Sequence, residues 1–110
     1  MRQTRTALFL LRRFGERHGE ASTWDTLGCT YARLGDHRRA DQCYAHALAL
    51  FREIGDRFFE AEVLVHRADD RWAAGDHGAA RADWVSSMRI LEGLRHPQAA
   101  VLRQRIDQGG

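Results

Sequence analysis

Residues 24–47 read WDTLGCTYARLGDHRRADQCYAHA, and this stretch decides the fold. Apolar or small residues recur in it at intervals of three and four, which is the spacing of a helix with one buried face. The dipeptide Gly35-Asp36 interrupts the pattern, and these residue types respectively end and begin helices. The stretch therefore predicts two helices, at 19–34 and 37–54, joined by a short turn.

The same punctuation returns forty residues later. Gly35-Asp36-His37 recurs as Gly75-Asp76-His77, and residues 7–24 match residues 47–64 at eight of eighteen positions. A period of this length is typical of stacked helical units that bury their apolar faces only against one another. We predict an all-α fold without a sheet and with six helices, at 4–14, 19–34, 37–54, 58–74, 77–94 and 97–107.

The composition agrees with a single domain over residues 1–110 and limits its function. A net charge of +2 is too small to indicate nucleic-acid binding by itself. Two cysteines without a regular pattern favour a reduced, cytoplasmic setting over a disulfide framework. Arg12-Arg13 ends the apolar run near the N-terminus, so we expect neither a signal peptide nor a membrane anchor.

Seven residues of the opening stretch lie at fixed spacings that define a known repeat. They are Trp24-x2-Leu27-Gly28-x2-Tyr31 and Ala40-x3-Tyr44-x2-Ala47. The pattern resembles the tetratricopeptide repeat (TPR). This resemblance implies antiparallel helix hairpins stacked as a superhelix: 4–18 as the second helix of a partial repeat, repeats at 19–56 and 57–95, and a capping helix at 96–108. The later repeat departs from the pattern, because Arg67 and Arg71 stand where Leu and Tyr are expected.

Two features point to a particular group of TPR proteins. They are the forty-residue period and the sequence of residues 50–57, which connects one repeat to the next. Both features are similar to the TPR arrays at the C-terminal end of bacterial transcriptional activators of the antibiotic-regulatory (SARP) type. That resemblance implies a protein-binding module in transcriptional regulation. The DNA-binding and nucleotide-binding parts of those activators have no counterpart here, since no phosphate-binding loop motif occurs. All 17 basic residues are arginine, which agrees with a GC-rich bacterial source.

The family geometry places the first helix of each repeat along a concave groove that binds partners. The predicted groove residues are Ser22, Asp25, Thr26, Cys29, Arg33, Glu62, Val65, His66, Asp69 and Trp72. Three carboxylates against one arginine predict an acidic groove, with Val65 and Trp72 as apolar anchors. We therefore expect a basic peptide or protein segment as the partner, or another domain of a larger regulator. The alternative is that these acids are only solvated and that partners bind elsewhere.

The N-terminal helix predicts a second surface. Residues 4–14 correspond to the second helix of a repeat whose first helix is absent from this sequence. We expect Leu8, Phe9, Leu11 and Phe14 to be left uncovered and to mediate self-association.

Other classes of function have weaker support in the residues. Neither a nucleophile-elbow motif nor a glycine-rich phosphate loop occurs, so we expect no enzyme activity and no cofactor. Cys43 and His46 lie one helical turn apart, but no second pair completes a metal site, and we predict none. The alternative function is a small helical nucleic-acid-binding protein that uses its arginine-rich N-terminal helix.

Overall fold

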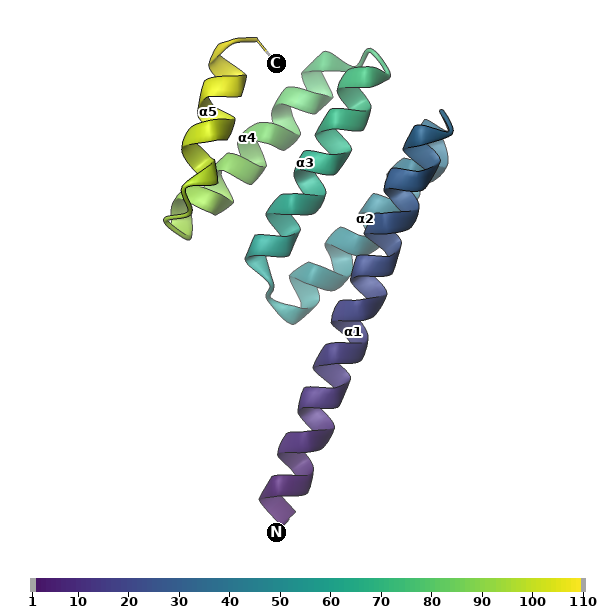
Figure 1. The fold of residues 1–110 in the computed structure, drawn as a ribbon, viewed down its shortest axis with the longest axis vertical. Coiled ribbons are helices and arrows are strands. Elements are labelled where there is room, and N and C mark those ends of the chain that lie inside the picture. Colours follow the sequence, from purple (N-terminus) through teal and green to yellow (C-terminus); the bar gives the residue numbers. More distant parts are fainter. Residues whose placement is uncertain (1, 110) are drawn as a thin grey trace.

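The computed structural model describes the backbone of residues 2–109 and the side chains of residues 7–10 and 12–109. Within this part of the chain the secondary structure is helical, without strands. The helices are α1 (Arg2–Arg33), α2 (His37–Ile54), α3 (Arg57–Ala73), α4 (His77–Gly93) and α5 (Gln98–Asp107). They form antiparallel hairpins in a flat stack of 56 × 32 × 15 Å (Figure 1). No helix of the described residues has the length and apolar character needed to cross a membrane.

The first three turns share one design, which confirms the predicted hairpins. Gly35, Gly55 and Gly75 have φ angles of 79°, 76° and 89°, a left-handed conformation that glycine adopts without steric cost. The aspartate after each glycine caps the next helix by accepting a hydrogen bond from the backbone N–H three residues later. These turns fix the helices as consecutive antiparallel neighbours.

The N-terminal region differs from the prediction. Two helices were expected, at 4–14 and 19–34, but α1 continues without a break from Arg2 to Arg33. Its first half projects away from the rest of the stack (Figure 1). The expected unit at 4–18 is therefore the first half of a long helix and not a separate helix.

A difference in capping explains why this break is missing. Gly15 aligns with Gly55 in the forty-residue repeat, but Glu16 occupies the position of Asp56, the residue that caps α3. The Asp56 carboxylate accepts a hydrogen bond from the Phe59 backbone N–H at 3.0 Å. Glutamate is not among the preferred N-cap residues, so the chain at Glu16 lacks the group that starts a new helix.

Small residues hold the first hairpin together. Ala21 and Ala40 are completely buried between α1 and α2, and Gly28 lies directly against the ring of Tyr44. Tyr44, only 1% exposed, fills the space between the helices. In the next hairpin Trp84 has the same role and is also 1% exposed. Both aromatic residues are therefore part of the core.

An ion-pair network occupies the two positions where the later repeat departs from its pattern. The Arg67 guanidinium donates from Nε and Nη2 to the two carboxylate oxygens of Asp83, both at 2.9 Å. Arg71 donates from Nη1 to Asp83 Oδ2 at 3.0 Å. Asp83 is buried on α4, so it fixes the two α3 arginines against that helix.

Candidate functional site

The predicted groove residues lie on α1 and α3, and side chains link these helices to α5. His66 on α3 forms an ion pair with Asp25 on α1, with His66 Nδ1 at 2.9 Å from Asp25 Oδ1. Further along α3, Asp69 Oδ1 forms an ion pair with Arg105 Nη2 of α5 at 3.1 Å. Helices α2 and α4 lie behind these three helices in the view of Figure 1. The three helices therefore present one continuous face, which we call the groove face.

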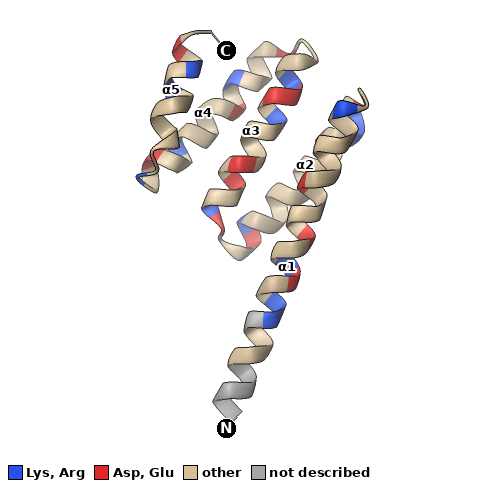
Figure 2. Ribbon diagram, viewed as in Figure 1, with Lys and Arg blue, Asp and Glu red and all other residues tan. Residues whose placement is uncertain are grey.

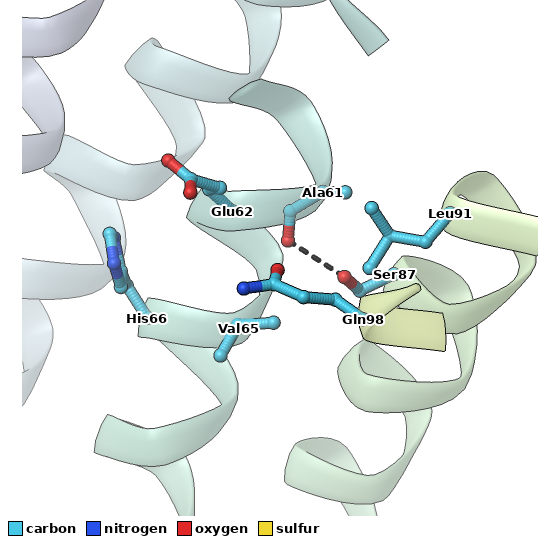
Figure 3. A pocket seen from close by; sticks show the side chains of 7 residues that line it. All are labelled: Ala61, Glu62, Val65, His66, Ser87, Leu91 and Gln98. Carbon is cyan, nitrogen blue, oxygen red and sulfur yellow. Dashed lines mark hydrogen bonds between the residues drawn. The ribbon is translucent and has the colours of Figure 1, made fainter. Parts of the chain in front are cut away.

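A cleft of about 200 Å³ opens on the groove face between α3 and α5. Its lining residues are Ala61, Glu62, Val65, His66, Ser87, Leu91 and Gln98 (Figure 3). The base is rigid, because the buried Ser87 hydroxyl donates to the Ala61 carbonyl at 2.8 Å and ties α4 to α3. Val65 and Leu91 supply apolar surface, while Glu62, His66 and Gln98 supply polar groups around it.

Beside this cleft, three groups of different chemistry meet at the contact of α1 with α3. Asp25 and Cys29 lie one turn apart on α1, and His66 faces them from α3. One ligand atom from each lies within 4.8 Å of the others. The Tyr44 hydroxyl also approaches Cys29 Sγ, at 3.6 Å. All three side chains are half-buried, so the cluster is reachable from the groove face.

The surroundings of this cluster alter its acid-base properties. Burial raises the pKa of the Cys29 thiol, although the hydrogen bond from Tyr44 opposes this change. The hydrogen bond to Asp25 raises the pKa of His66, and partial burial acts in the opposite direction. The imidazolium form of His66 is therefore favoured beside the Asp25 carboxylate.

The other end of α3 is organised by aromatic packing. Asp69 Oδ1 accepts a hydrogen bond from the indole Nε1 of Trp84 at 3.2 Å and also forms the ion pair with Arg105. The Trp72 ring stacks on His77 with centroids 3.8 Å apart and interplanar angle 16°, and it also packs near Trp84. One face of Trp72 is thus covered within the chain, and the residue does not line the cleft.

The remaining predicted residues lie along α1. Ser22 is half-buried, whereas Thr26 and Arg33 are exposed. The Thr26 hydroxyl donates to the Ser22 carbonyl at 3.0 Å, so this donor is already used within the helix. None of these three residues lines the cleft.

The groove face is less acidic than the sequence count suggested. Asp25 is paired with His66 and Asp69 with Arg105, so two of the three predicted carboxylates have positive partners in the chain. Glu62 forms no ion pair with the other described residues. Figure 2 shows acidic residues near both ends of α3, with arginines beside them. The negative charge open to a partner is therefore concentrated at Glu62.

Several residues of this face were missed by the sequence reasoning. Ser87, Leu91 and Gln98 line the cleft from α4 and α5, and Arg105 contacts both Asp69 and the ring of Trp84. The prediction took groove residues only from the first helices of the two repeats. The closing helix predicted at 97–107 was the available sign that a further helix would line the groove.

The projecting half of α1 carries an exposed apolar surface. Leu8, Phe9 and Leu10 are 58–59% exposed, and Phe14 is 48% exposed. Leu11, also predicted for this surface, has a side chain outside the described residues. Phe14 borders a shallow hollow with Ile54, Phe58 and Leu94. Clustered apolar side chains of this kind are typical of surfaces that another protein covers.

We expect the chain to self-associate through this surface. Phe9→Glu should shift the chain toward the monomer by at least about tenfold in dissociation constant, because a charge would enter an apolar contact. Sedimentation velocity over a concentration series measures this shift. Val101→Glu is the matched control, since Val101 is 63% exposed on α5 and lies outside the surface. A wild-type chain that stays monomeric at high micromolar concentration would contradict the expectation.

Comparison with known proteins does not identify the chain: no protein-family model, no curated protein and no solved structure matches it.

Proposed function

We propose that this chain is a protein-interaction module of the TPR type from a cytoplasmic bacterial regulatory protein, acting in transcriptional regulation. It holds a peptide or protein segment on the groove face and carries out no catalysis. The observation that carries the proposal is the cleft between α3 and α5, which has a rigid apolar base and a few polar groups at its rim. This combination is typical of sites that bind side chains of a partner.

The chemistry of the cleft suggests which segment it accepts. Val65 and Leu91 suit one medium-sized apolar side chain, since the volume of about 200 Å³ excludes a large ligand. Glu62 offers a carboxylate for an arginine or lysine of the same segment, and the Gln98 amide can pair with its backbone. Charge would set the rate and specificity of binding, and the apolar contact most of the affinity.

A single charge reversal tests this proposal. Peptides selected against the wild-type chain from a random displayed library provide the ligands. Glu62→Arg should weaken their binding at least about tenfold, or 1.4 kcal/mol, as measured by fluorescence polarisation. The melting temperature should stay nearly constant, because Glu62 forms no ion pair with the other described residues.

Glu20→Arg is the matched control. Glu20 is exposed on α1 and lies about 160° around that helix from Ser22, away from the groove face. Its reversal changes the net charge by the same amount and should leave binding within about twofold. Equal losses in both variants would show a general charge effect and would remove the cleft from the proposal.

Asp69 is unsuitable for this purpose, although the sequence presents it as an equivalent acid. Its carboxylate accepts a hydrogen bond from Trp84 and forms an ion pair with Arg105, so Asp69→Arg would disturb the contacts of α3 with α4 and α5. A loss of binding in that variant would not separate partner recognition from stability.

Nucleic-acid binding is the competing function, and one observation favours it. Arg12 and Arg13 are exposed on the projecting half of α1. The wild-type chain can be titrated with duplex DNA at several salt concentrations. Affinity that falls steeply with salt and is lost in Arg12→Ala/Arg13→Ala would support this function in place of peptide binding.

A further inference from the structure

The cluster at the α1–α3 contact has the composition of a metal site. Asp25 offers a carboxylate oxygen, Cys29 a sulfur and His66 the ring nitrogen Nδ1, and these atoms all lie within 4.8 Å of one another. His66 Nδ1 already lies 2.9 and 3.0 Å from the two Asp25 oxygens. A set of one nitrogen, one sulfur and one oxygen ligand is typical of zinc, which binds all three donor types tetrahedrally.

The helices bring these residues together by a simple arrangement. Asp25 and Cys29 are four residues apart on α1, so both side chains leave the same side of that helix. On α3, Glu62 lies four residues before His66, and both line the adjacent cleft. Two packed helices thus bring three ligand residues together, two from α1 and one from α3. Water can take the fourth place in a tetrahedral site.

The required adjustment is small. Zinc bonds of about 2.0–2.3 Å place neighbouring tetrahedral ligands roughly 3.3–3.8 Å apart. The atoms of the cluster lie within 4.8 Å of one another, so the widest pair needs to close by about 1 Å. His66 Nδ1 and the Asp25 oxygens, at 2.9 and 3.0 Å, need to open by a few tenths of an ångström. All three side chains are half-buried. The Tyr44 hydroxyl donates a hydrogen bond to Cys29 Sγ at 3.6 Å, and this bond can orient the sulfur.

We propose that Asp25, Cys29 and His66 bind a divalent zinc-type metal ion, with water as the fourth ligand. The ion would link α1 to α3 directly, where the two helices otherwise share only a small contact. Binding releases the thiol proton of Cys29 and the Nδ1 proton of His66 to the solvent, because the thiolate and the neutral imidazole are the ligands. The proposal does not depend on partner binding, since it concerns the chain alone.

Titration of the full chain with Co²⁺ under a phosphine reductant tests the site. Co²⁺ replaces Zn²⁺ in tetrahedral sites and gives a near-ultraviolet absorption band when it is bound to a thiolate. We expect this band to saturate at one equivalent and to disappear when Zn²⁺ is added. Competition with a chromophoric chelator then gives the zinc affinity. A chain that shows no thiolate band would overturn the proposal.

Matched variants decide which residues hold the metal. Cys29→Ser and His66→Gln should each lower zinc affinity by about 100-fold or more, and Asp25→Asn by about tenfold or more. Cys43→Ser and His46→Gln are the controls, because they remove the other cysteine and a histidine that stacks on Trp24 outside the cluster. Far-ultraviolet circular dichroism checks that each variant is folded.

Two results in this series would reject the site even if metal binds. One is loss of the cobalt band in Cys43→Ser with its retention in Cys29→Ser, which would place the metal at the residue 43 and 46 pair. The other is wild-type zinc affinity in both Cys29→Ser and His66→Gln, which would leave Asp25 and His66 as an ordinary ion pair. As an independent readout, Zn²⁺ should raise the melting temperature of the wild-type chain but not of Cys29→Ser.

Discussion

Replacing Asp83 with alanine should lower the free energy of unfolding by about 3 kcal/mol. The Asp83 carboxylate is 5% exposed and accepts three hydrogen bonds from Arg67 and Arg71. Its removal takes this partner from Arg67 and leaves Arg71 with the more distant Asp41, at 3.4 Å. We place the loss at the low end for a broken buried pair, because both arginine side chains keep partial contact with water. Urea denaturation followed by circular dichroism measures it.

Two further variants separate the effect of the buried charge from that of the ion pairs as such. Asp41→Ala removes another partner of Arg71, at 3.4 Å, but Asp41 is 45% exposed and the expected loss is under about 1 kcal/mol. The triple change Arg67→Leu, Arg71→Tyr and Asp83→Ala removes all three charges and should recover most of the stability lost in Asp83→Ala. If the triple variant is as unstable as Asp83→Ala alone, the uncompensated arginines are not the cause.

The hairpins could be predicted from local residues alone. Each glycine–aspartate turn places a left-handed glycine beside a helix cap, and both requirements are met by residues adjacent in the sequence. The burial of the core aromatics Tyr44 and Trp84 follows from local sequence as well, because helical periodicity directs both residues to the buried face. Where the determinants are local, the sequence pattern is sufficient.

The continuous α1 shows the limit of reasoning by repetition. Alignment with the joint at 50–57 placed a turn near Gly15, but the turn needs the cap as well as the glycine. Glu16 replaces the capping aspartate, and the helix continues through both residues. The turn at Gly55 depends on the side chain of Asp56, and glutamate at position 16 is longer by one methylene group.

The site depends on contacts that no local pattern records. Cys29 and His66 are 37 positions apart and meet only because α1 packs on α3. A search for closely spaced ligand residues therefore found only the pair at 43 and 46. The arginines at 67 and 71 were recognised as departures from the repeat, but their partner Asp83 lies on the following helix and was not predicted. Tertiary pairing of polar groups is the information that the repeat pattern lacks.

The α1–α2 crossing provides the second test with a large expected effect. Gly28→Leu should lower the free energy of unfolding by about 3 kcal/mol, the upper end for overpacking a core. A Cβ atom at Gly28 would lie 2.6 Å from Tyr44 Cε1 and 2.7 Å from Cδ1, closer than carbon atoms approach. Tyr44 cannot move aside easily, because it is 1% exposed and its hydroxyl contacts Cys29. Thermal and urea denaturation both report the change.

Gly19→Leu is the matched control for this prediction, on the same helix. A Cβ at Gly19 would meet no atom within 4 Å, so only the higher helix propensity of leucine acts there. We expect Gly19→Leu to be neutral or to raise stability by up to about 1 kcal/mol. The difference between the two variants isolates the close approach of α1 to Tyr44. Similar melting temperatures for both would mean that α1 and α2 do not cross at Gly28. That crossing also positions Cys29 beside the Tyr44 hydroxyl, so zinc affinity should fall in Gly28→Leu and remain unchanged in Gly19→Leu.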